Sequence, residues 1–176
     1  MKSKPIDIAL RKNKGARILP GWISSFCQIT GASITNADFL FLEETDILRN
    51  IFAQNVKKAG ALHIYWPINT SYPEIERTIC HLAEQRERIV LFHKADSQIG
   101  ALFLSVNDIL KNTDNLRELL GGDISFITKD GTNGLCLERT FYDGKGGYIA
   151  DGIWELTAWG LFAQVVSDVK GPKLIQ

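Results

Sequence analysis

Three short apolar runs with helix-like segments between them constrain the fold of this chain most strongly. The runs are residues 39–42, 61–66 and 89–92, and each is rich in β-branched or aromatic residues. Strands that are buried on both faces of a mostly parallel sheet have this composition. Residues 45–59 and 71–88 connect the runs. The pattern predicts two right-handed strand–helix–strand units and therefore a mostly parallel α/β sheet.

Both connecting segments carry the signals of amphipathic helices. Thr45 can cap the first segment, and Gly60 follows its last turn. In the second segment, Ser71 and Glu74 have the spacing of a capping box, with Pro73 in the first turn where its missing N–H costs nothing. Because the carboxyl ends of parallel strands lie together, the polar residues that follow the runs would be neighbours.

The remaining segments predict that the sheet is mixed. Only a short turn separates residues 89–94 from the apolar residues 101–104, which favours an antiparallel pair. Two short helices are expected at residues 107–111 and 113–120, the second ending at a Gly-Gly pair.

Both ends of the chain carry further predicted elements. Residues 124–128 and 135–142 flank a turn with hairpin chemistry. Asp151 would then cap a buried helix over residues 152–168, since that stretch is almost entirely apolar. At the other end, the alternation of Ile6, Ile8 and Leu10 indicates a short strand.

The length and composition are those of one domain. The chain has 176 residues, of which 45% are hydrophobic, and we expect residues 1–176 to form a single α/β domain. No stretch has the length and apolarity of a membrane span and no signal core is evident, so we expect a cytoplasmic protein. Cys27, Cys80 and Cys136 are widely spaced, which suggests neither a disulfide framework nor a zinc site.

The charges are distributed unevenly although the formal net charge is zero. Residues 1–17 hold six basic side chains and one acidic one, and the rest of the chain holds the remaining 14 basic and 19 acidic residues. A basic end on an acidic body could bind nucleic acid. It could equally be a solvated terminal strand or a segment that folds onto the acidic surface of its own chain.

Motifs of the common enzyme classes are absent from the sequence. It contains no P-loop, no dinucleotide-binding glycine pattern, no HExxH pair and no GxSxG elbow, so we expect no cofactor and no metal. His93 is the best candidate for acid–base chemistry, because it ends a central run and Glu43 could lie near it. A small enzyme with a site at the strand ends around His93 and Glu43 is therefore one alternative.

Aromatic and acidic residues near the expected loops indicate instead a protein that docks on a basic partner. Rigid aromatic anchors beside carboxylates provide buried hot spots and electrostatic steering. The candidate partner-binding residues are Glu43, Glu44, Asp46, Trp66, Tyr72, Tyr142, Asp143 and Tyr148.

With these residues on one compact domain that lacks a catalytic motif, the chain resembles the immunity proteins of bacterial polymorphic toxin and contact-dependent growth inhibition systems. The resemblance implies a protein that is not an enzyme and that neutralises a cognate toxin, often a basic nuclease, by covering its active site or substrate surface. It implies a protein partner, with no membrane and no direct nucleic-acid contact. The small enzyme, and a regulatory module that binds nucleic acid through residues 1–17, remain the alternatives.

Overall fold

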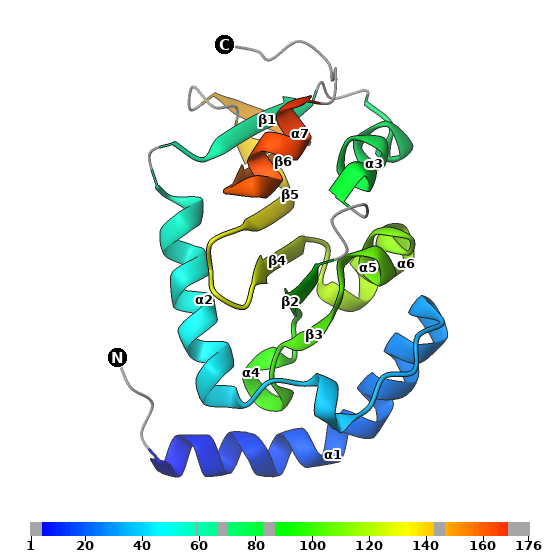
Figure 1. The fold of residues 1–176 in the computed structure, drawn as a ribbon, viewed down its shortest axis with the longest axis vertical. Helices are drawn as coiled ribbons and strands as arrows, with labels where there is room; N and C mark the ends of the chain where they lie inside the picture. The colour runs from blue at the N-terminus through cyan, green and yellow to red at the C-terminus, as the bar shows by residue number, and fades with distance from the viewer. Residues whose placement is uncertain (1–4, 59, 67–69, 83–86, 143–146, 169–176) are drawn as a thin grey trace.

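The computed structural model describes residues 5–58, 60–66, 70–82, 87–142 and 147–168 (Figure 1). Its elements in chain order are α1 (Pro5–Thr30), the 3-10 turn η1 (Asn36–Asp38), α2 (Leu42–Val56), β1 (Leu62–Trp66), α3 (Tyr72–Cys80), β2 (Arg88–Phe92), α4 (Asp96–Ile99), β3 (Leu102–Ser105), α5 (Val106–Leu110), α6 (Thr113–Leu120), β4 (Ile124–Thr128), β5 (Gly134–Tyr142), β6 (Tyr148–Trp159) and α7 (Leu161–Asp168).

The six strands form one sheet in the order β1-β6-β5-β4-β2-β3, and every neighbouring pair is antiparallel. The mostly parallel sheet predicted from the sequence is therefore wrong. The strands β1 and β2 run in the same direction, as two strands joined by a crossover helix should, but β6, β5 and β4 lie between them. Strands that follow each other along the chain are therefore not always neighbours in this sheet.

Several predicted elements are confirmed. The strands at residues 61–66, 89–92, 124–128 and 135–142 correspond to β1, β2, β4 and β5, and β4 and β5 form the expected hairpin. The antiparallel pairing of β2 with β3 is also as predicted. The two short helices before the hairpin are α5 and α6, and Gly121 ends α6 in a left-handed conformation.

The first predicted run, residues 39–42, is not a strand. Phe39 makes a single bridge to Leu102, and α2 already begins at Leu42, so the helix covers Leu42–Val56 rather than residues 45–59. The N-terminal strand is also wrong, because residues 6–10 belong to the 26-residue helix α1. Figure 1 shows α1 bending along its length, and Pro20 lies inside it, where proline removes a helical hydrogen bond.

The predicted C-terminal helix over residues 152–168 is wrong in its first half. Residues up to Trp159 form the long strand β6, Gly160 follows with a φ of +65°, and only Leu161–Asp168 is helical. A nearly uninterrupted apolar segment is typical of a buried helix and of a buried strand alike, so its composition could not distinguish them. Pairing with β5 on one side and β1 on the other selects the strand.

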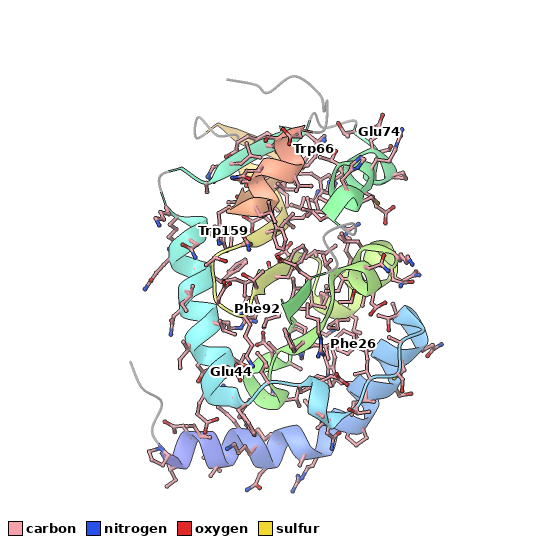
Figure 2. The ribbon with its side chains drawn as sticks, viewed as in Figure 1. Phe26, Glu44, Trp66, Glu74, Phe92 and Trp159 are labelled. Carbon is pink, nitrogen blue, oxygen red and sulfur yellow. The ribbon has the colours of Figure 1, made fainter. Side chains whose placement is uncertain are left out.

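The two faces of the sheet are covered unequally. One face contributes Ile64, Leu91, Phe126, Leu137 and Leu156 to the main core, which the buried side chains of α3, α5, α6 and α7 complete. On the other face a smaller core packs against α2, Leu40 and Ala101; its sheet residues are Val90, Phe92, Phe103, Ile127 and Trp159. Figure 2 shows Phe92 and Trp159 between α2 and the strands. None of the described helices is long and apolar enough to cross a membrane.

Candidate partner-binding surface

The half of the second face that lies beyond α2 is lined with polar side chains. Cross-strand register places two rows of residues on it: His63, Thr157, Cys136 and Ser125 in one row, and Tyr65, Glu155 and Glu138 in the next. Residues opposite each other in an antiparallel pair point to the same face. We call these seven residues the open half-face; Thr157 and Cys136 are buried within it, and the other five are exposed or half-buried.

Hydrogen bonds hold one end of the open half-face in a fixed geometry. The Tyr65 hydroxyl donates to Glu155 Oε1 at 2.9 Å, and His63 Nδ1 lies 3.1 Å from the same oxygen. Thr157 Oγ1 is 3.2 Å from His63 Nδ1. At the other end, the Ser125 hydroxyl and the Cys136 sulfur are 3.4 Å apart. The side chains are therefore preorganised rather than free to rotate.

The carboxylates of this region repel one another. Burial raises the pKa of Glu138 above its ordinary value, and the nearby charges of Asp123 and Glu155 raise it further. Burial also raises the pKa of Asp123, against the opposing effects of the Arg139 backbone N–H and the Arg117 charge. Among the described residues, none donates a hydrogen bond to the Glu138 carboxylate. The surface thus carries negative charge that a cationic partner would stabilise.

The predicted acidic residues of α2 lie elsewhere, and each is already paired with a cation of the same chain. Asp46 accepts two hydrogen bonds from Arg11, at 2.7 and 2.8 Å. Glu43 lies 3.4 Å from Lys12 Nζ, and Glu44 lies 3.1 Å from Lys129 Nζ. Two of the six cations of the basic N-terminal segment thus lie on the chain's own acidic surface, which was one of the interpretations left open from the sequence.

The aromatic candidates divide into three groups. Trp66 is 1% exposed and lies in the main core, so it is removed from any binding surface (Figure 2). Tyr72 is the first residue of α3. Tyr142 and Tyr148 are brought opposite each other across the β5–β6 pair, beyond a register shift. Asp143 lies outside the described residues.

His93 is a core residue, which argues against the proposed acid–base site. It is 2% exposed, with Nε2 3.0 Å from the Gly100 carbonyl oxygen, and the Ala95 N–H donates to Nδ1. Burial lowers its pKa to about 4, so the ring is neutral near pH 7. The carboxylate that acts on this pKa is Asp96, not Glu43.

A small pocket of about 190 Å³ lies between α2 and the open half-face. Its walls include Arg49, His93, Asp123 and Ser125. The Arg49 guanidinium is already bound to the buried Asp96 carboxylate, with Nε 2.9 Å from both carboxylate oxygens. The described residues contain no cluster of ligands suited to a metal ion.

Sequence reasoning missed the open half-face, although a signal for it exists. In β1, the exposed His63 and the half-buried Tyr65 alternate with the buried Ile64 and Trp66, and in β6 the half-buried Glu155 precedes the buried Leu156. Such alternation indicates a sheet with one face open to solvent. We interpreted the first segment as buried on both faces and the second as a helix.

The comparison with known protein families gives one match. The pattern of the YxiF protein family matches residues 30–145, from the end of α1 through β5. This region includes His63, Tyr65, Ser125 and Glu138 of the open half-face. No curated protein and no solved structure matches the chain. Because the match covers most of the sequence, the chain belongs to the YxiF family.

Proposed function

We propose that this YxiF family member is an immunity protein that binds a cognate bacterial toxin and neutralises it by covering its active site or substrate surface. The observation that carries the proposal is the open half-face, a preorganised polar surface on a sheet whose opposite face is fully packed. Its chemistry fits recognition better than the acid–base chemistry expected of His93, because that residue is neutral and its ring nitrogens are occupied in the core.

The charge of this surface supports a basic partner, and a nuclease domain has a basic substrate surface because it binds phosphates. Glu138 and Asp123 are held where their ionised forms are destabilised. A cation of the toxin placed beside these two carboxylates would stabilise their ionised forms. Part of the binding free energy would therefore come from relieving the electrostatic destabilisation that is present in the free protein. We place this action in the cytoplasm, where such a toxin would attack its substrate.

The acidic start of α2 is the competing location for the toxin. Glu43, Glu44 and Asp46 would have to exchange their ion pairs with Lys12, Lys129 and Arg11 for pairs with the partner. Exposed ion pairs contribute little, and exchanging one for another gains little. We therefore favour the open half-face, with the Tyr142–Tyr148 pair at the end of the same two strands.

Isothermal titration calorimetry against an inactivated toxin domain encoded by a neighbouring gene tests the proposal. We expect a 1:1 complex, and we expect Glu138→Gln to weaken it roughly tenfold, since losing one interfacial charge contact costs about 1–2 kcal/mol. Glu43→Gln is the matched control, because it removes one carboxylate from the competing surface, and it should change the affinity by less than about twofold.

Three results would count against the proposal. Absence of any complex would refute the function. Weakening by Glu43→Gln with no effect of Glu138→Gln would move the binding surface to α2. An equal, small effect of both variants would show that neither carboxylate lies in the interface.

A further inference from the structure

The small pocket between α2 and the open half-face is built from side chains of separate segments. Arg49 and Phe52 come from α2, Lys94 follows β2, and Asp123 and Ser125 lie at the start of β4. These five residues are exposed or half-buried, so a ligand can reach them. At about 190 Å³ the pocket is smaller than the roughly 300–1,000 Å³ of common ligand sites, so it fits a small molecule.

The two cations of the pocket have hydrogen-bond donors to spare. Arg49 is held on the Asp96 carboxylate through Nε and Nη2, and its central carbon lies 5.1 Å from the centre of the Phe92 ring. Within the described part of the chain, no group accepts a hydrogen bond from Arg49 Nη1. The Lys94 ammonium lies 5.8 Å from the centre of the Trp22 ring and pairs with no carboxylate of the described residues. This side of the pocket therefore presents a fixed guanidinium and an ammonium, the two groups that bind carboxylates most strongly.

The acidic side of the pocket is Asp123. Its carboxylate accepts from the Arg139 N–H, and the cation that lowers its pKa is Arg117, which does not line the pocket. In the described structure, neither Arg49 nor Lys94 forms an ion pair with Asp123. Partial burial raises the pKa of Asp123, so a bound cation would stabilise its ionised form. Charges of both signs thus line one pocket without neutralising each other.

We propose that this pocket binds a small α-amino acid, with the ligand carboxylate on Arg49 and Lys94 and the ligand ammonium on Asp123. An α-amino acid carries both charges on one carbon atom, so a pocket of this size can pair both at once. A purely anionic ligand would face Asp123, and a purely cationic one would face Arg49 and Lys94. The Ser125 hydroxyl can accept a further hydrogen bond from the ammonium. Phe52, half-buried in the wall, favours a short aliphatic side chain on the ligand.

Chemical-shift titration of the full chain by nuclear magnetic resonance tests the proposal with matched ligands. L-Valine carries both charges, 3-methylbutanoate lacks the ammonium, and isobutylamine lacks the carboxylate. We expect L-valine to bind at least about tenfold more tightly than either analogue, because each analogue loses one of the two charge contacts.

Two variants at exposed positions locate the ligand without disturbing the core. Asp123→Asn should weaken L-valine binding about tenfold and leave the binding of 3-methylbutanoate unchanged, because only the ammonium contact is lost. Lys94→Gln should weaken the binding of both ligands, because both carry the carboxylate. The matched control is Lys14→Gln, which removes an exposed lysine of α1 that does not line the pocket, and it should change neither affinity.

This inference does not depend on the immunity function, and its failure would leave that proposal standing. Equal affinity for L-valine and 3-methylbutanoate would show a site for anions and overturn the zwitterion site. Absence of shift changes with L-alanine and L-valine at concentrations up to about 10 mM would also overturn it. Equal weakening by Lys14→Gln and Lys94→Gln would place the binding outside the pocket, with the same consequence.

Discussion

The His93 imidazole lies among the rings of Trp22, Phe26 and Phe39, with centroid distances of 4.9, 5.6 and 6.1 Å. Burial among these rings lowers the pKa of His93 to about 4 from 6.5, and it outweighs the Asp96 carboxylate, which favours the charged form. As the pH falls below 6.5, the unfolded chain binds a proton that the folded chain excludes. His93 therefore destabilises the folded state progressively as the solution is acidified.

We predict that this residue removes up to about 3 kcal/mol of the free energy of unfolding between pH 6.5 and pH 4. Urea unfolding at several pH values measures the effect. His93→Gln should be less stable at pH 7, because the ring leaves a poorly filled site, but it should show a shallower loss on acidification. If the free energy of unfolding of the wild type and of His93→Gln fell equally with pH, His93 would not be the cause of the acid destabilisation.

Glu138 should have the opposite pH dependence. Its folded pKa is raised above the ordinary 4.5, so its ionised form destabilises the folded state, and protonation on acidification removes that penalty. Glu138→Gln should therefore be at least as stable as the wild type at pH 7. The difference should shrink as the pH falls through the folded pKa, and it should vanish below about 4.5. Thermal unfolding of both proteins checks this, and a variant clearly less stable at pH 7 would contradict it.

At the scale of elements, α1 is attached to the body by a close helix–helix contact. Gly15 is buried against α4, where a Cβ atom would lie 2.1 Å from the Gln98 oxygen. Arg11, one turn earlier, binds Asp46 of α2. Gly21 lies in the same helix, is exposed, and has no heavy atom within 4 Å of an added Cβ. The two glycines form a natural pair for comparison.

We predict that Gly15→Ala destabilises the protein by about 1–3 kcal/mol, because the helices must separate. Gly21→Ala should stabilise it by about 0.5–1 kcal/mol, because alanine has the higher helix propensity. Urea denaturation of the two variants measures both effects. Equal effects of the same sign would show that α1 does not pack on α4 as described.

Local sequence signals predicted many elements correctly and failed at identifiable places. The capping box of Ser71 and Glu74, formed as expected, fixes the start of α3. The turn between Thr128 and Gly134 likewise fixes the hairpin, with Asp130 accepting from the Thr132 N–H. The apolar residues of β6 and the short run at Phe39 carried no equally local signal. Their conformations depend on strands far away in sequence.

At the scale of the molecule, local sequence signals do not determine the order of the strands in the sheet. The β1 edge strand pairs with β6, more than eighty residues later, and that pairing puts His63 next to Glu155. The open half-face exists only because of such long-range pairing and because α2 covers part of one face. The candidate site could therefore not be assembled from neighbouring residues of the sequence, whereas the absence of recognisable catalytic motifs could be read directly.

The central claim is that the open half-face neutralises a toxin, and growth of cells that produce the toxin tests it most directly. We predict that co-production of the wild-type chain restores growth, and that folded Glu138→Lys, which puts a cation against a basic partner, does not. Full protection by a Glu138→Lys protein whose circular dichroism matches the wild type would contradict the claim, as would failure of the wild-type chain to protect.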